Sequence, residues 1–140
     1  EGRPLAKVIR KLRDHIADEQ RAVEGADAAT RAFLLADFHV CLAEQLGHQL
    51  LVDVLRDLTA RTTLAATLYQ SKHEAGQSCA DHEAIVAALE NGDRPRARSL
   101  MLAHIGNVER ALEVEASAEP DASARLRATL APVALPRAKR

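Results

Sequence analysis

The stretch 81–105, DHEAIVAALENGDRPRARSLMLAHI, decides the fold. It contains two runs in which apolar residues recur every three or four positions, and this spacing predicts two amphipathic helices. Between them, Asn91-Gly92 is a stop signal for the first helix, and Asp93 is an N-cap signal for the second. A connection this short makes the two helices antiparallel neighbours.

Each of these helices carries a histidine on its apolar face. His82 lies in register with Ile85, and His104 lies in register with Met101. A third histidine, His39, lies in the apolar run LLADFHVCL at 34–42. Neutral imidazole is the commonest metal-ligating side chain, and three histidines with open positions suit Zn²⁺ or Ni²⁺. The alternative is that each histidine is an ordinary hydrogen-bonded residue of the core.

The composition predicts one globular, helical domain. The chain has 140 residues, of which 47% are hydrophobic, 28% are charged and 2% are aromatic. Residues that favour helices over strands dominate, and a chain of this length can bury a real core. The formal net charge of −1 argues against direct nucleic-acid binding. With no signal peptide or long apolar run, we expect a cytoplasmic protein that does not enter a membrane.

Periodicity along the rest of the chain predicts an all-α, antiparallel helical bundle of about six helices. Residues 1–131 are expected to form the domain, and the basic tail 132–140 is expected to be disordered. The segment 69–80 reads as a loop. The predicted helices cover about 5–23, 28–46, 51–68, 82–90 and 94–115, with a last short one around Leu126 and Leu130.

One predicted helix carries a charge on its apolar stripe. The stripe contains Leu51, Val54, Leu58, Arg61, Ala65 and Leu68. A guanidinium on such a face is costly unless it is paired. Arg61 therefore either pairs with an acidic side chain of the protein or awaits an anionic ligand, for which its planar fork is suited.

The spacing of carboxylates narrows the class of metal site. Helical di-iron sites need Glu three residues before an inward histidine, but Ala36, Cys79 and Met101 occupy these positions. The chain contains no His-Glu-x-x-His stretch of the zinc peptidases. Cys79 could supply a fourth zinc ligand; the alternative is a small buried thiol.

Two distant segments together resemble a known family. The first is FHVCLAEQLG at 38–47. The second joins DHEAIV at 81–86, the Gly92-Asp93 turn and Met101-x-x-His104. This ordered set resembles the FCD domain, the all-helical C-terminal effector-binding domain of FadR-type GntR transcription regulators, over about residues 5 to 115.

The resemblance implies a function and a site. Many members of this family hold a divalent metal through one Asp and three His, and the metal helps to bind a small carboxylate effector. By resemblance, His39, His82 and His104 are the metal ligands, and Arg61 and Asn107 are effector contacts. Effector binding is expected to change how a homodimer presents N-terminal winged helix-turn-helix domains to operator DNA.

The chain departs from the family pattern at several places. The family's metal Asp lies four residues before the first histidine, where this chain has Leu35. His48 stands where the family has Asn after the helix-ending Gly. The family domain's first helix and the winged helix-turn-helix are not recognised in this sequence. Two outcomes are open without this Asp: water or an effector oxygen takes its coordination position, or the site binds metal more weakly.

Two other functions fit the same residues. One is a metal-dependent enzyme in a helical bundle, in which three histidines hold a metal-bound hydroxide. That reading needs a general base, and Asp81 and Glu83 are expected to point away from the face of His82. The other is a ligand-free bundle that serves dimerisation.

Overall fold

The computed structural model describes residues 5–118 and contains five helices in that range. They are α1 (Leu5–Gly25), α2 (Ala28–Leu46), α3 (Gln49–Tyr69), α4 (Lys72–Glu90) and α5 (Arg94–Ala118). The predicted all-α bundle is confirmed. The predicted short helix around Leu126 and Leu130 and the tail 132–140 lie outside the described residues.

Local signals in the sequence set the helix ends. The Asp27 carboxylate caps α2 by accepting a hydrogen bond from the Thr30 amide at 2.9 Å. Gly47 ends α2 at φ 72°, a left-handed conformation that favours glycine. Gly92 has φ 71° in the α4–α5 turn, and Asp93 accepts a hydrogen bond from the Arg96 amide at 3.0 Å.

The loop predicted at 69–80 is wrong, because α4 begins at Lys72. Ser71 caps the helix by accepting a hydrogen bond from the Glu74 amide, while the Glu74 carboxylate accepts one from the Ser71 amide. This reciprocal pair satisfies two amides that a helix start leaves unpaired. The added turns place Ala75, Ser78 and Cys79 on the buried face of α4.

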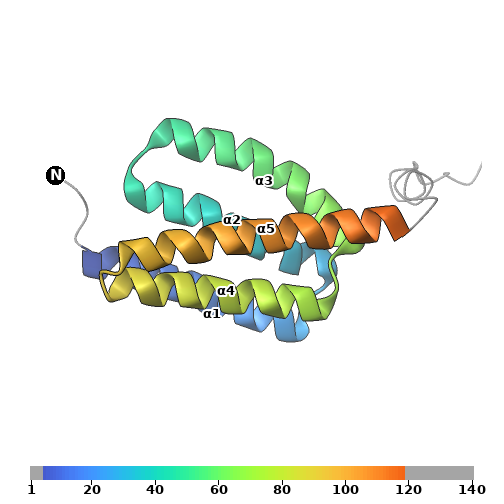
Figure 1. The fold of residues 1–140 in the computed structure, drawn as a ribbon, viewed down its shortest axis with the longest axis horizontal. Helices are drawn as coiled ribbons and strands as arrows, with labels where there is room; N and C mark the ends of the chain where they lie inside the picture. The colour runs from blue at the N-terminus through green and yellow to red at the C-terminus, as the bar shows by residue number, and fades with distance from the viewer. Residues whose placement is uncertain (1–4, 119–140) are drawn as a thin grey trace, which may run out of the picture.

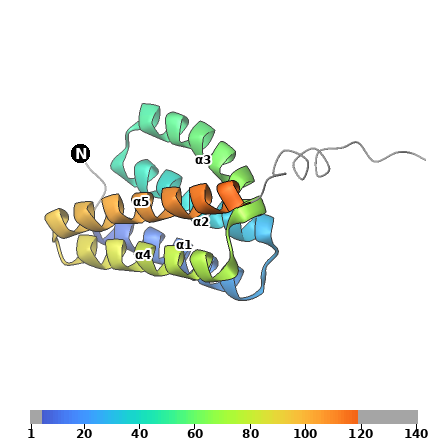
Figure 2. The ribbon, with the colours of Figure 1, turned by 45° about the vertical axis from the view of Figure 1, so that its right-hand side comes forward.

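The helices form a four-helix core with α3 at its side. Helices α1 and α4 pack together, α5 runs along α4, and α2 contacts both α1 and α3 (Figures 1 and 2). The core is built from aliphatic residues and one phenylalanine: Ile9, Leu12, Ile16, Leu35, Phe38, Ile85 and Val86. Helix α3 lies against α2 and splays away from α5 at its N-terminal end (Figure 1).

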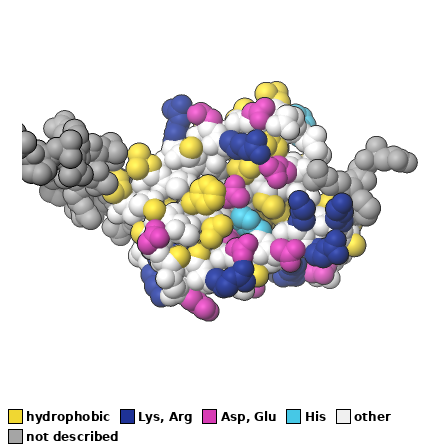
Figure 3. All heavy atoms as spheres, turned by 180° about the vertical axis from the view of Figure 1, so that it is seen from behind, with side chains coloured by type: hydrophobic (Ala, Val, Ile, Leu, Met, Phe, Trp, Pro, Cys, Tyr) yellow, Lys and Arg dark blue, Asp and Glu magenta, His cyan; other side chains and the backbone are white. Residues whose placement is uncertain are grey.

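The surface is mixed in character. On the face seen in Figure 3, basic and acidic side chains are interspersed with hydrophobic ones, so this face carries no extended patch of one charge. Among the described helices, none combines the length and the apolar character needed to cross a membrane.

Candidate metal centre

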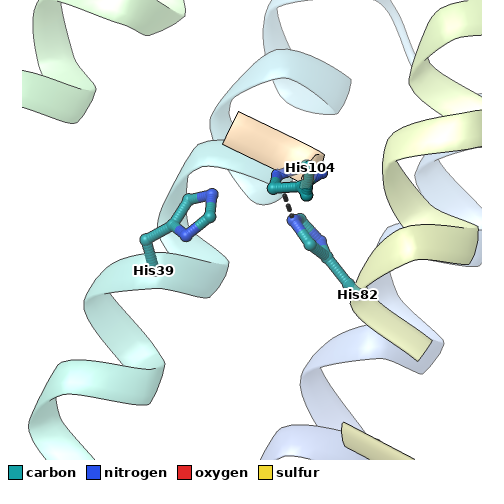
Figure 4. A group of neighbouring side chains, drawn as sticks. All are labelled: His39, His82 and His104. Atoms are coloured by element: carbon teal, nitrogen blue, oxygen red, sulfur yellow. Dashed lines mark hydrogen bonds between the residues drawn. The ribbon is translucent and has the colours of Figure 1, made fainter. Parts of the chain in front are cut away.

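Three helices bring the predicted histidines together. His39 projects from α2, His82 from α4 and His104 from α5 (Figure 4). Each ring offers one ligating nitrogen, and these three atoms lie within 4.8 Å of one another. His82 and His104 are buried, and His39 is partly buried. The triad is therefore assembled in the core from segments up to 65 positions apart in the sequence.

A buried carboxylate fixes the orientation of His82. The Nδ1 atom of His82 lies 2.9 Å and 3.1 Å from the two carboxylate oxygens of Glu19 in α1, and the Glu19 side chain is fully buried. Phe38 stacks on the His82 ring at a centroid distance of 3.9 Å and an interplanar angle of 11°. With Nδ1–H donated to Glu19, Nε2 of His82 faces the triad as a lone pair.

Glu19 has further partners on its other side. His15 Nε2 lies 3.3 Å from Glu19 Oε1 and donates to the Leu34 carbonyl at 3.0 Å. Burial opposes the charge of His15, but the hydrogen bonds to Glu19 and Leu34 outweigh it and raise the pKa of His15. Burial, followed by the charge of Glu19, raises the pKa of the Cys79 thiol to about 12. Cys79 therefore remains a protonated, buried thiol and does not join the triad.

His104 is oriented in the same way, from the opposite side. Its Nδ1 lies 3.2 Å from Oδ2 of Asp81, and its Nε2 lies 3.1 Å from Nε2 of His82. When both Nδ1–H groups are donated to carboxylates, two neutral rings direct two lone pairs at each other. A separation of 3.1 Å then requires a cation between the two nitrogens, which is either a proton or a metal ion.

The surroundings disfavour the proton. Burial, followed by the charges that His82 and His104 would carry, lowers the pKa of His39 to about 3. Burial and the neighbouring His82 also lower the pKa of His104, against the opposing influence of Asp81. These shifts favour neutral imidazoles at His39 and His104, and the neutral imidazole is the form that ligates metals. Nitrogens bound to one tetrahedral zinc ion lie about 3.3 Å apart, which the His82–His104 separation nearly matches.

A cavity opens beside the triad. Its volume is about 230 Å³, and all three histidines line it. Most of the remaining wall is apolar and comes from α2, α3 and α5, with Leu35, Leu58 and Ile105 among the lining residues. Polar lining groups are Thr59, Thr62, Gln70 and Ser78. The centre is thus accessible to a small molecule, which would contact the imidazoles at one end.

The other predicted site residues lie farther out. Arg61 is exposed and pairs with Asp57 at 3.3 Å, and it does not line the cavity. Asn107 is exposed and lines a smaller adjoining pocket with Gln70, Ser78 and Asp81. The structure therefore brings together the three histidines but neither predicted effector contact. Leu35, in place of the family's Asp, is buried and contributes an apolar wall.

Sequence analysis missed the two carboxylates that hold the imidazoles. Glu19 lies on the same helical stripe as Leu12 and Ile16, and this position is the signal that could have revealed its burial and its need for a buried partner. Asp81 was expected to point away from the site. It is half-buried and reaches His104 on the adjacent helix, a contact that depends on how α4 and α5 pack.

Comparisons with known proteins point to one family. The sequence model of the FCD domain matches residues 3–107, which is most of the chain. Searches of the curated proteins and of the solved structures returned no match.

Proposed function

Because the chain belongs to the FCD domain family, the effector-binding domains of GntR regulators, we propose that it senses a small carboxylate through a divalent metal held by His39, His82 and His104. One observation supports the presence of a metal site. The Nε2 atoms of His82 and His104 face each other at 3.1 Å while carboxylates lie at both Nδ1 atoms. Zinc or nickel suits such a nitrogen set.

In this proposal the metal is a fixed Lewis-acidic anchor for the effector's carboxylate. Glu19 and Asp81 hold the tautomers of His82 and His104, and burial lowers the pKa of His39 and of His104. The cavity beside the triad receives the rest of the effector. FCD domains are typically regulatory and non-catalytic. The described cavity wall contains no carboxylate that could act as a general base, since Glu19 and Asp81 contact the far side of the rings.

The proposal also covers how effector binding would change DNA binding. As in regulators of this family, effector binding would shift a homodimer between arrangements that present N-terminal winged helix-turn-helix domains differently to operator DNA. Exposed apolar side chains on α3, including Leu50 and Val54, offer surface for such a dimer. Cytoplasmic location is part of the proposal, because FCD regulators are usually cytoplasmic.

Arg61 and Asn107 remain predicted effector contacts. Neither lines the main cavity, so each would act at its periphery. Arg61→Ala and Asn107→Ala variants test these roles by titration with a bound acid. A tenfold loss of affinity with unchanged metal content would support a contact, and an unchanged affinity would remove it.

Metal content and thermal stability test the main proposal together. Purified protein should contain close to one equivalent of metal, and His82→Ala should lose it. Carboxylic acids should raise the melting temperature of the metal-loaded protein, because a ligand that binds the native state stabilises it. His73→Ala is a matched control, since His73 is an exposed histidine of the same helix. Equal and negligible metal in both wild type and His82→Ala would refute the metal centre.

A further inference from the structure

We infer that the effector is a small monocarboxylate with an apolar tail, and not a dicarboxylate or a tricarboxylate. This inference rests on the proposed function, because it assumes that the carboxylate binds at the histidine triad. It is drawn from the size of the cavity beside the triad, from the apolar side chains in its wall and from the hydrogen bonds that its hydroxyl groups already make.

The size of the cavity limits the ligand. Its volume of about 230 Å³ lies below the range of about 300–1,000 Å³ that is usual for drug-sized ligands. It therefore suits a ligand smaller than a typical drug molecule. A five- or six-carbon monocarboxylate has this size.

The wall away from the triad is aliphatic. Leu35 and Ala36 of α2 face it from one side, Leu55 and Leu58 of α3 from another, and Ile105 of α5 from a third. Leu35 is buried one helical turn before His39, so the apolar surface begins next to the triad. Alkyl groups bound here gain by leaving water, whereas a second carboxylate would lose hydration with no Lys or Arg among the described lining residues to compensate it.

The two threonine hydroxyl groups of the wall cannot compensate a second carboxylate. Thr59 Oγ1 donates its hydrogen to the Leu55 carbonyl at 2.7 Å, and Thr62 Oγ1 donates to the Leu58 carbonyl at 3.0 Å. Both therefore offer a methyl group and acceptor lone pairs to the cavity. A carboxylate needs donors, so these threonines favour an uncharged tail.

Ser78 and Gln70 are the polar lining side chains with a possible donor to spare. Ser78 lies one turn before His82 and is buried, so it belongs to the end of the cavity that receives the carboxylate. Gln70 lies at the C-terminal end of α3. Among the described lining residues, none is Lys or Arg. In this proposal, the positive charge at the cavity is therefore that of the metal at the histidine triad.

Calorimetric titration of the zinc-loaded full chain with a matched pair of acids tests this inference. Valerate and glutarate have the same five carbons, and they differ in whether the far end is a methyl group or a carboxylate. Valerate should bind roughly tenfold or more tightly than glutarate. From acetate to valerate, each added methylene should tighten binding about fourfold, and the gain should stop once the tail leaves the cavity.

A charge placed at the rim should reduce or abolish the preference. Leu58 lines the cavity and is 52% exposed, so Leu58→Lys can be introduced without disturbing the core. It should raise glutarate affinity relative to valerate by roughly tenfold. Leu64→Lys is the matched control, because Leu64 is another exposed leucine of α3, at 44%, that does not line the cavity.

The outcomes separate this inference from the function on which it rests. Glutarate binding as tightly as valerate to the wild-type protein would overturn the monocarboxylate inference and leave the effector-sensing proposal intact. Bound zinc with no response to any acid would overturn both. Valeramide binding as tightly as valerate would show that the carboxylate is not recognised, and would also overturn both.

Discussion

Nε2 of His82 and Nε2 of His104 lie 3.1 Å apart, and the Nδ1 atom of each ring contacts a carboxylate from behind. Each imidazole is thereby held in the tautomer whose lone pair faces its neighbour. Glu19 and Asp81, which lie behind the rings, therefore determine the geometry of the centre together with the histidines. They also provide the most direct ways to perturb the centre without deleting a ligand.

Replacing Glu19 by Gln should weaken zinc binding by roughly 10- to 100-fold. The amide oxygen can still accept the hydrogen bond from His82 Nδ1, but the negative charge that raises the basicity of the ring is lost. Competition with a chromophoric chelator measures the change. Glu83→Gln is the control, because Glu83 is next to His82 in sequence but bonds to Gln20 on the surface, at 2.7 Å. An equal loss in both variants would contradict the assigned role of Glu19.

Asp81→Asn should weaken zinc binding in the same direction but by less. The Asp81–His104 contact is longer, at 3.2 Å, and the Asp81 side chain is 22% exposed, whereas Glu19 is fully buried. Solvent therefore screens the interaction of Asp81 with its ring more strongly. The same chelator competition ranks the two variants, and a larger loss in Asp81→Asn would contradict this ordering.

The metal-free protein should lose stability as the pH falls below about 6.5. Free histidine titrates near 6.5, whereas burial lowers the pKa of His39 to about 3 and also lowers that of His104. Between these values the unfolded chain binds protons that the native protein does not, so acid favours unfolding, by up to about 1.4 kcal/mol per pH unit for each histidine. The raised pKa of His15 acts in the opposite direction, since its contribution is present at low pH and is lost as the pH rises.

Urea unfolding in the presence of a chelator, at several pH values between 5 and 7, measures this slope. His39→Leu should reduce this slope by the contribution of one proton, up to about 1.4 kcal/mol per pH unit. His73→Leu, which changes an exposed histidine, should leave the slope unchanged. A slope that is identical in all three proteins would show that the buried rings do not titrate as described.

Phe38→Ala should destabilise the fold by about 3–5 kcal/mol, because Phe38 is fully buried and stacks on His82. Phe33→Ala, in the same helix, should change the free energy of unfolding by no more than about 0.5 kcal/mol, since Phe33 is 56% exposed. Chemical denaturation of the two variants provides the comparison. Similar losses in both would mean that α2 is rotated relative to the structure.

Ser71→Ala should cost about 1 kcal/mol, because it removes the N-cap of α4 and half of its reciprocal hydrogen-bond pair with Glu74. Ser99→Ala is a suitable control at an exposed position within α5. The free energy of unfolding from urea titration is the readout. No difference between the two variants would argue that α4 starts later in the chain, as its sequence first indicated.

Periodicity was enough to predict the helical class, four of the five helix positions and a histidine on the apolar face of three helices. That the three histidines meet at one site was implied by the family resemblance. Periodicity was not enough for α3, which carries two apolar stripes. The stripe with Leu51, Val54 and Arg61 was expected to be buried, but Val52, Leu55 and Thr59 turn inward. Either stripe could face α2, and packing chooses between them. Because the other stripe faces α2, Arg61 lies on the surface, where it pairs with Asp57.

The partners of the imidazoles were harder to predict than the imidazoles. Glu19 and His82 are 63 positions apart, and Asp81 and His104 are 23 apart. Their contacts depend on the rotation of each helix about its axis, which a sequence pattern fixes only approximately. A charged residue on an otherwise apolar helix stripe is the sequence signal that can point to such a buried partner. At Glu19 the charge is buried and contacts His82 of the metal centre. At Arg61 the charge shows instead that its stripe of α3 faces the solvent.

Helix α3 has a consequence for how a ligand reaches the triad. Among its described side chains Val52 alone is buried, and it packs chiefly against α2. Local opening requires the least free energy where few apolar contacts must be broken. Backbone amides of α3 should therefore exchange with deuterium sooner than those of α1 and α4. An effector held between α3 and α5 would slow that exchange, so the rate in α3 would report occupancy of the cavity even without a change in the average fold.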